Sequence, residues 1–391
     1  TPVQSRFLAL DVLRGFAILA IVAYHCLPIT NIEIDRWPFW MNGVKFGGKL
    51  GVSLFFVLSG FSIHFSQLRH RWSAQTSEIE FEMNRSQWQS FFQRRFWRLY
   101  PSYLAALSLA IGLNWGWSFI RGRNALFPAI EDLLAHLFLV HPFFPNTFFG
   151  IIPALWFIGV QAHLYLLYPI FWAWIQRWNI DRAVLAVLAI TLLSRLLANT
   201  LAFSNASESL TAAIWMNAPQ RWFEWCCGAW VAHRIVQNQW LPFSSTILAG
   251  LVGAVWSIWG DTFRVLDEPV LGAIISSILW GILNWRLNPP ARVRSLKSSP
   301  SPRRWNLPLS PQIPFAGTIA TRARSQIERI LIALGYLSYP IYLTHQIFIP
   351  YVRSALDRLS SQLSLQTLLL FLIVSAITLP VSIWFDRQID R

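Results

Sequence analysis

The first apolar segment of the chain, residues 10–27, is long enough to cross a bilayer yet carries ionisable side chains. It reads LDVLRGFAILAIVAYHCL, with Asp11 and Arg14 near its start and His25 near its end. Ionisable groups inside a membrane are energetically expensive, so they need a structural or functional reason. Arg14 and His25 are eleven residues apart, and in one helix they return to almost the same face, about 16 Å apart along the axis. The segment therefore predicts a transmembrane helix with one polar face.

Each of these residues also has a purely structural interpretation. Asp11 and Arg14 have the i,i+3 spacing of an ion pair at the membrane surface, and His25 has the position of an interfacial histidine. One such residue alone would not distinguish structure from function. Their occurrence together on a single span favours a functional face.

The composition of the whole chain is that of a membrane protein. Of its 391 residues, 54% are apolar and only 13% are charged, which leaves too little polar surface for a soluble protein of this length. The net charge of +14 would indicate nucleic-acid binding in a soluble chain, but Arg-rich loops also set the orientation of a multispanning protein. We therefore expect an all-α transmembrane bundle that forms one domain over residues 1–391, with lipid around it and no nucleic-acid partner.

Hydropathy predicts about ten spans with both chain termini in the cytoplasm. Two basic segments lie between predicted spans. They are an Arg-rich loop at 69–98 and a Pro/Arg-rich linker at 286–327. We expect the linker to be poorly ordered. The positive-inside rule places both in the cytoplasm, which requires an even number of crossings between them. Residues 121–152 are therefore predicted to form a short re-entrant or interfacial element on the outer side. The predicted spans are 7–27, 48–68, 99–119, 153–176, 181–203, 216–236, 243–260, 266–285, 328–350 and 363–385.

The cysteines point to neither a disulfide framework nor a metal site. Cys26, Cys226 and Cys227 have no ligand spacing with histidines, and adjacent cysteines rarely bridge each other. We therefore expect no metal. The first apolar run is too long and too charged for a cleavable signal peptide, so we expect this span to direct insertion itself.

Three further stretches combine apolar runs with polar side chains. The first is KLGVSLFFVLSGFSIHF, whose small residues, Ser53 among them, permit close contact between helices. The second is FFQRRFWRLYPSY, where Arg95 and Arg98 lie one helical turn apart, either as a positive-inside anchor or as a clamp for a polyanion. The third is PALWFIGVQAHLYLLYP, which places Gln161 and His163 in a span, either as contacts between helices or as part of a site.

Taken in order with the late stretch LGYLSYPIYLTHQ, these segments resemble the membrane-bound acyltransferase 3 family. Its members include O-acetyltransferases of bacterial polysaccharides and lipid-linked sugars. The most diagnostic family pattern, an Arg, ten intervening residues and a His in the first helix, is met by Arg14 and His25. The paired arginines of the third helix are met by Arg95 and Arg98. The resemblance covers most of the chain, from residue 6 to about residue 346.

One position departs from the family pattern. Where such proteins usually have a Glu in a motif resembling LWSLSVEEQFYLLYP, this sequence has Gln161, followed by Ala162 and His163. A carboxylate is lost at this point. Either His163 compensates for it, or the site works without it.

The resemblance implies a multi-pass protein of the bacterial inner membrane. Such a protein would move an acyl group, most simply acetyl, from cytoplasmic acyl-CoA to a hydroxyl of an envelope glycan or glycolipid. Arg14, Arg95 and Arg98 would bind the polyanionic donor, and Asp11 would orient Arg14. His25 would act as general base or as a transient acyl carrier, and the sequence leaves both routes open. Secondary site candidates are Ser53, Gln161, His163 and His345.

Two other classes of function stay open from the sequence. A transporter or flippase of a glycan or lipid intermediate would also place Arg and His along a substrate path, without bond chemistry. A sensor or structural partner without catalysis is the third class, and only Gln161 in place of Glu favours it.

Overall fold

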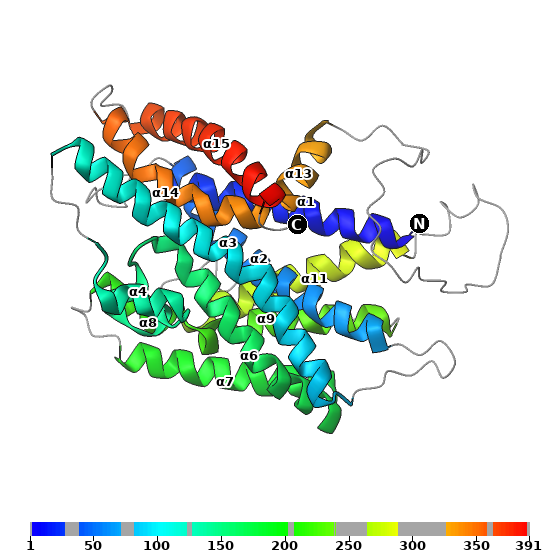
Figure 1. Cartoon of the computed structure of the whole chain (residues 1–391). Coiled ribbons are helices and arrows are strands. Elements are labelled where there is room, and N and C mark those ends of the chain that lie inside the picture. The colour runs from blue at the N-terminus through cyan, green and yellow to red at the C-terminus, as the bar shows by residue number, and fades with distance from the viewer. Residues whose placement is uncertain are drawn as a thin grey trace.

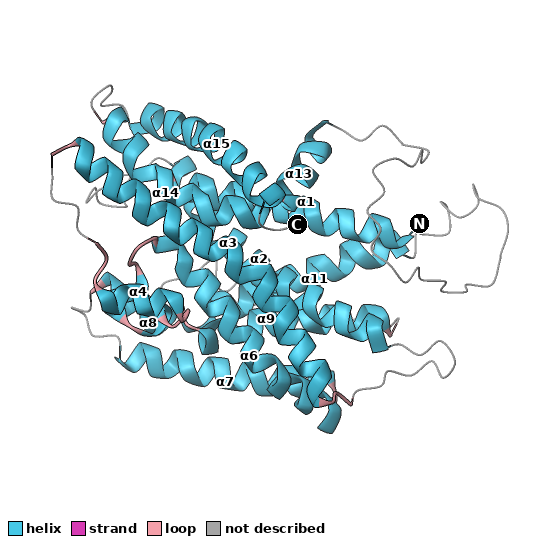
Figure 2. Ribbon diagram, viewed as in Figure 1, coloured by secondary structure: helices cyan, strands magenta, loops and turns pink. Residues whose placement is uncertain are grey.

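The computed structural model of the chain describes residues 2–27, 39–71, 82–122, 127–201, 207–237, 239, 264–287, 326–357 and 363–388. All regular secondary structure within these ranges is helical (Figure 2), so the predicted all-α fold is confirmed. The predicted span at 243–260 and all but the ends of the predicted linker at 286–327 lie outside the described residues.

Long helices form an up-and-down bundle (Figure 1). They are α1 (Pro2–His25), α2 (Phe39–Arg71), α3 (Arg85–Ile120), α6 (Trp156–Arg177), α7 (Ile180–Leu201), α9 (Ala218–Val236), α11 (Asp267–Leu287), α14 (Ser338–Leu356) and α15 (Leu363–Gln388). Shorter helices are α4 (Ile130–Leu137), η2 (His141–Phe143), α5 (Pro145–Phe148), η3 (Pro153–Leu155), α8 (Glu208–Trp215), η4 (Arg264–Leu266) and α13 (Gln326–Tyr336). Within the described ranges, six helical segments are long and apolar enough to cross a membrane. The full number of crossings and their direction stay predictions.

The two ends of the bundle differ in what they carry. The first residues of α1 and α3 and the last residues of α2 lie at one end (Figure 1). The last residues of α3 lie at the other end, together with α4 and α8. This arrangement places the N-terminus and the basic start of α3 at the same end. It is the geometry expected if both face the cytoplasm, and we call this the basic end.

Two predicted boundaries are corrected. The predicted loop at 69–98 is helical over most of its described length, because α2 continues to Arg71 and α3 begins at Arg85. The early start of α3 has a local cause, since Asn84 and Gln87 form a reciprocal capping box. The predicted span at 328–350 is two helices, α13 and α14, separated at Leu337. Pro340 follows the break by three residues, and its nitrogen carries no hydrogen for the carbonyl of Tyr336 one turn earlier.

Close helix contacts in the core depend on glycines. A Cβ added at Gly60 of α2 would lie 1.8 Å from the carbonyl oxygen of Trp225, and one added at Gly228 of α9 would lie 1.8 Å from that of Val57. The two backbones therefore approach more closely than any side chain would allow, as small residues permit in membrane helices. Gly51 approaches α1 in the same way, with Ala17 O at 2.8 Å from its added Cβ. Of the small residues predicted to permit helix contact in α2, Gly51 and Gly60 do so.

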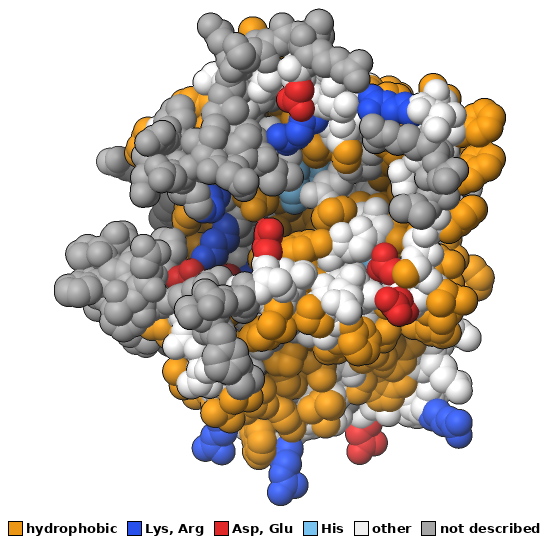
Figure 3. Space-filling view, turned by 90° about the vertical axis from the view of Figure 1, so that its left-hand side faces the viewer, with side chains coloured by type: hydrophobic (Ala, Val, Ile, Leu, Met, Phe, Trp, Pro, Cys, Tyr) orange, Lys and Arg blue, Asp and Glu red, His pale blue; other side chains and the backbone are white. Residues whose placement is uncertain are grey.

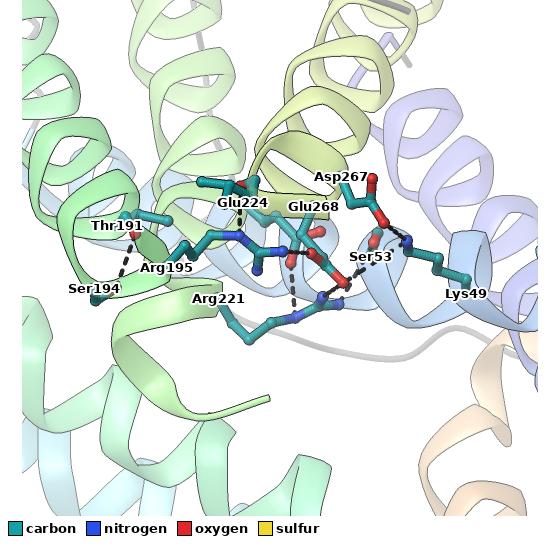
Figure 4. Close-up of polar contacts among 10 residues, drawn as sticks. Lys49, Ser53, Thr191, Ser194, Arg195, Arg221, Glu224, Asp267 and Glu268 are labelled. Carbon is teal, nitrogen blue, oxygen red and sulfur yellow. Dashed lines mark hydrogen bonds and ion pairs between the residues drawn. The ribbon is translucent and has the colours of Figure 1, made fainter. Parts of the chain in front are cut away.

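A partly buried cluster of charges joins α2, α7, α9 and α11 (Figure 4). Its ion pairs are Lys49 with Asp267 and Glu268, Arg195 with Glu268, and Arg221 with Glu224 and Glu268. Three cations therefore face three carboxylates, which offsets the cost of burying each charge. Ser53 belongs to this cluster, with its hydroxyl 3.5 Å from a guanidinium nitrogen of Arg221.

Residues 127–155 form short helices instead of a further membrane span. Within them, the rings of His136 and His141 stack with centroids 4.1 Å apart, and His136 contacts the carboxylate of Asp132 at 3.0 Å. Both histidine side chains are fully buried. Burial, with a smaller contribution from nearby His136, lowers the pKa of His141 to about 3. This segment therefore folds around neutral histidine.

The contact between α2 and α9 can be tested with paired glycine variants. We expect Gly228→Ala to lower the stability of the protein by about 1–3 kcal/mol, because the new methyl group would collide with backbone of α2. Thermal unfolding of detergent-purified protein, followed by tryptophan fluorescence, measures the loss. Gly281→Ala is the matched control, because an added Cβ there meets no atom within 4 Å. Equal unfolding temperatures for the two variants would contradict the close contact.

Buried His141 predicts that stability depends on pH. Its pKa is about 3 in the folded protein against an ordinary value of about 6.5, so the unfolded chain takes up the proton first. The stabilisation is therefore present above pH 6.5 and is lost as the pH falls toward 3, by up to about 1.4 kcal/mol per pH unit. We expect His141→Phe, which keeps a stacked ring, to flatten this slope in unfolding measurements between pH 7 and 5. Parallel slopes for wild type and variant would contradict the assignment.

Candidate active site

A cavity of about 140 Å³ opens between α1, α2, α3, α6 and α14. Its lining combines aliphatic and aromatic side chains with a group of cations. No acidic side chain of the described residues lines it. The polar residues of the lining are Arg14, Ser59, Ser62, Arg95, Arg98, Gln161, Tyr165, Ser338, Tyr339 and Tyr342. We call this space the arginine cavity.

Arg14 is held in place by two hydrogen bonds. Its guanidinium donates to Oδ1 of Asp11 at 2.9 Å and to Oγ of Ser62 at 2.8 Å. The first contact is the i,i+3 pair that the sequence predicts, and the second joins α1 to α2. The hydroxyl of Ser62 in turn donates to the carbonyl of Leu58 at 2.7 Å. Arg14 therefore has a fixed orientation at the wall of the cavity.

Arg95 and Arg98 enter the same cavity from α3. Neither side chain forms a hydrogen bond or ion pair with the part of the chain that the structure describes, although Arg95 lies over the ring of Phe91 at 5.4 Å. Arg14 has Asp11 as its counter-ion, so two positive charges of the cavity are left uncompensated. Guanidinium groups in this arrangement favour an anion with several oxygen acceptors.

Gln161 of α6 contributes a buried amide without a partner. Its side chain is only 4% exposed, and neither its oxygen nor its nitrogen is hydrogen-bonded to the described residues. A buried amide left unpaired costs free energy that a bound ligand would recover. The cavity therefore offers both a donor and an acceptor beside its three arginines.

His25 at the end of α1 is paired with His345 of α14. Nδ1 of His25 lies 3.0 Å from Nε2 of His345, and Nδ1 of His345 lies 2.8 Å from the carbonyl oxygen of Tyr342. A carbonyl only accepts, so Nδ1 of neutral His345 carries the hydrogen and its Nε2 accepts from Nδ1 of His25. The bonds thus select the tautomer of His25 whose Nε2 is unprotonated. Viewed from the end that carries α4 and α8, the surface is hollowed and a histidine side chain is visible inside the hollow (Figure 3).

Tyr342 connects the histidine pair to the arginine cavity. Its ring lines the cavity and lies 5.6 Å, centroid to centroid, from the ring of His345. On the other side of the pair, Arg353 donates to the carbonyl of Leu27 at 2.8 Å and caps the end of α1 beside His25. The imidazoles are therefore held from two helices.

The structure brings together most of the predicted site residues, and it separates two of them. Arg14, Arg95, Arg98 and Gln161 line one cavity, Asp11 contacts Arg14, and His25 contacts His345. Ser53 lies instead in the charge cluster, and the ring of His163 packs on Phe143 at 4.5 Å. His163 is not among the residues that line the cavity beside Gln161, so it does not occupy the place of the missing carboxylate.

Three residues at the site could not be recognised as site residues from the sequence alone. Ser62 of α2 contacts Arg14, and Tyr342 and Arg353 of α14 contact His345 and His25 respectively. The closest sequence signal was the polar spacing of SYPIYLTHQ, which places Ser338, Tyr342 and His345 within two turns of one helix. That spacing defines a polar helix face, but it does not show which other helices this face contacts.

Comparison with known proteins gives the family of the chain. Residues 7–387, nearly the whole sequence, match the family described as an acyltransferase domain. The chain belongs to the acyltransferase 3 family. This confirms the resemblance carried by the Arg and His of α1 and the arginines of α3. Its family and its apolar helices make it an integral multi-pass membrane protein.

One relative adds chemical detail. Over 173 residues the chain is 28% identical to "Putative peptidoglycan O-acetyltransferase YrhL" of Bacillus subtilis strain 168. The match covers 41% of this chain and 23% of the relative, so the chain spans less than a quarter of the relative's length by this match. No solved structure matches the chain.

Proposed function

We propose that this protein is a membrane O-acyltransferase that moves an acyl group, most simply acetyl, from acyl-CoA to a hydroxyl of an envelope glycan or glycolipid. The observation that carries the proposal is the tautomer of His25, whose Nε2 is left as a base by the bond to His345. The family of the chain supports acyl transfer, and the name of the relative supports an acetyl group and a glycan acceptor.

The arginine cavity suits the acyl-CoA donor. CoA carries several phosphate oxygens, and Arg14, Arg95 and Arg98 present planar, multidentate donors to them. The volume of about 140 Å³ is smaller than the space a whole cofactor-sized ligand occupies, so only part of the donor fits inside, and we assign the part of the cavity beside Gln161 to the acyl and thioester end. The phosphates then lie toward the start of α3, where Arg98 is exposed. This direction agrees with a donor that enters from the basic end.

The histidine pair suits the chemical step. Nε2 of His25 takes the proton of the acceptor hydroxyl as its oxygen attacks the thioester carbonyl. The carbon–sulfur bond breaks, an ester forms, and the proton is returned to the CoA thiolate, so that the products are ester and free CoA. His345 holds the reactive tautomer and stabilises the cation on His25 while it exists. Transient acylation of His25 itself is the other route that these groups allow.

Gln161 gives the cavity a neutral group where the family pattern has a carboxylate. Its amide nitrogen is a donor without a partner among the described residues, and such a donor stabilises the oxygen of a polarised carbonyl. A neutral amide also leaves the attraction of the arginines for the donor undiminished. We propose that Gln161 contacts the thioester, so that a carboxylate is not needed at this position.

Replacement of His25 tests the base. We expect His25→Ala to lower transfer of labelled acetyl from acetyl-CoA into the glycan or lipid fraction of membranes by about 10²- to 10⁴-fold, since general-base catalysis contributes that much. Expression and unfolding temperature are matched to wild type. His163→Gln is the comparison, because His163 packs on Phe143 away from the cavity. Transfer that persists in His25→Ala and disappears in His163→Gln would refute the assignment.

Replacement of Arg98 tests the donor site. We expect Arg98→Ala to raise the KM for acetyl-CoA about tenfold with a smaller change in kcat, because a charged hydrogen bond to phosphate is lost. Arg94→Ala is the matched control, since Arg94 is exposed on the same helix and does not line the cavity. Equal KM values for the two variants would show that the arginine cavity does not hold the CoA phosphates.

A further inference from the structure

A second cavity, of about 590 Å³, lies between the last turns of α3, the segment 127–153 and α14. Its polar lining is Asn114, Asp132 and Gln346, and its aromatic lining includes Trp115, Trp117 and Tyr351. The volume is within the range of small-molecule sites. We call this space the tryptophan cavity.

The polar groups of the tryptophan cavity can form hydrogen bonds in addition to those they make with the described residues. The side-chain oxygen of Gln346 accepts from the backbone nitrogen of Ala154 at 2.6 Å, which leaves its amide nitrogen free to donate. Asn114 forms no hydrogen bond with the residues that the structure describes. Asp132 adds a carboxylate, one oxygen of which contacts His136 at 3.0 Å. Together they offer donors and acceptors on planar groups to a ligand rich in hydroxyls.

The aromatic groups form a partly open wall beside them, and the guanidinium of Arg121 lies over the ring of Trp117 at 4.5 Å. Trp115 is 52% exposed and Trp117 is 37% exposed, and the ring of Trp117 meets that of Tyr351 at 5.2 Å, edge to face. Tryptophans at this depth also serve as interfacial anchors. These two rings differ from simple anchors because they border a cavity whose other wall carries two amides and a carboxylate. A sugar ring presents C–H groups on its faces and hydroxyls at its edge. The aromatic rings match the faces, and the planar polar groups match the hydroxyls.

The tryptophan cavity and the arginine cavity follow one another along α14. Tyr339 and Tyr342 line the arginine cavity, and Gln346 and Pro350, further along the same helical face, line the tryptophan cavity. Between them lies the backbone of Ala154, whose oxygen accepts from Tyr342 at 2.7 Å and whose nitrogen donates to Gln346 at 2.6 Å. His345 precedes Gln346 on α14, and its ring lies 5.6 Å from that of Tyr342, although it is not among the lining residues of either cavity.

From this arrangement we infer that the tryptophan cavity binds the sugar unit whose hydroxyl is acylated. The inference rests on the proposed function and adds the class and place of its acceptor. The sugar hydroxyl reaches the histidine pair from one side of the partition, and the thioester reaches it from the other. The hydroxyl proton passes to His25, the ester bond forms as the thioester bond breaks, and CoA leaves as the thiol.

The test uses full-length protein in lipid nanodiscs with labelled acetyl-CoA. The sugar probe is the disaccharide of N-acetylglucosamine and N-acetylmuramic acid, and diacylglycerol is the lipid-alcohol probe. We expect acetyl transfer to the disaccharide, with Asn114→Ala raising its KM about five- to tenfold through loss of a hydrogen bond. The KM for acetyl-CoA stays unchanged. Trp115→Ala is a second variant with the same expected effect, and Asn199→Ala is the matched control, an exposed asparagine on α7 outside the cavity.

Binding is measured separately, as quenching of tryptophan fluorescence by the disaccharide without donor. Transfer to the disaccharide that neither Asn114→Ala nor Trp115→Ala alters would overturn the cavity assignment and leave the proposed function standing. Preferred acylation of diacylglycerol would overturn the sugar class. Quenching that Asn114→Ala weakens, without any acetyl transfer by wild type, would support the cavity and refute the proposed function. The absence of both quenching and transfer would overturn the inference.

Discussion

Burial of ionisable groups among apolar helices is the constraint on which this fold depends. Charged side chains within the bundle are expensive unless they are paired. Most are paired, as in the Arg14 and Asp11 contact and in the cluster built around Glu268. Arg95 and Gln161 are two of the side chains with buried atoms that have no hydrogen-bond partner among the described residues, and others, such as His141 and Gln220, lie elsewhere. Both Arg95 and Gln161 line the arginine cavity, where a donor would supply the missing contacts.

The sequence predicts the parts of this protein that depend on local pattern. The Asp11 and Arg14 contact follows from i,i+3 spacing, and the small residues of α2 follow from the need for close packing. The pairing of His25 with His345 does not follow, because 320 residues separate them and periodicity defines a helix face without its neighbour. The break at Leu337 was missed because hydropathy is insensitive to a proline in the middle of an apolar run.

The replacement of the family carboxylate by Gln161 disturbs the site less in the folded structure than the sequence alone suggests. A carboxylate at this position would lie in a cavity with three arginines and reduce their pull on an anionic donor. The amide instead offers one donor and one acceptor without charge. His163, which sequence reasoning offered as a substitute, packs on Phe143. The departure therefore changes the electrostatics of the cavity, and no acidic side chain of the described residues lines it in place of the carboxylate.

The inferred partition at Ala154 would let one histidine pair serve two different substrates. The proposed donor is an anion and the inferred acceptor is a sugar rich in hydroxyls, so each needs a lining that the other does not. Tyr342 and Gln346 are four residues apart on α14 and hold the same backbone unit from its two ends. This keeps the cationic and aromatic linings apart, and His345 lies between Tyr342 and Gln346 in the sequence of α14. In the proposed mechanism the reacting groups would meet only at the imidazoles, which would limit transfer of the acyl group to water.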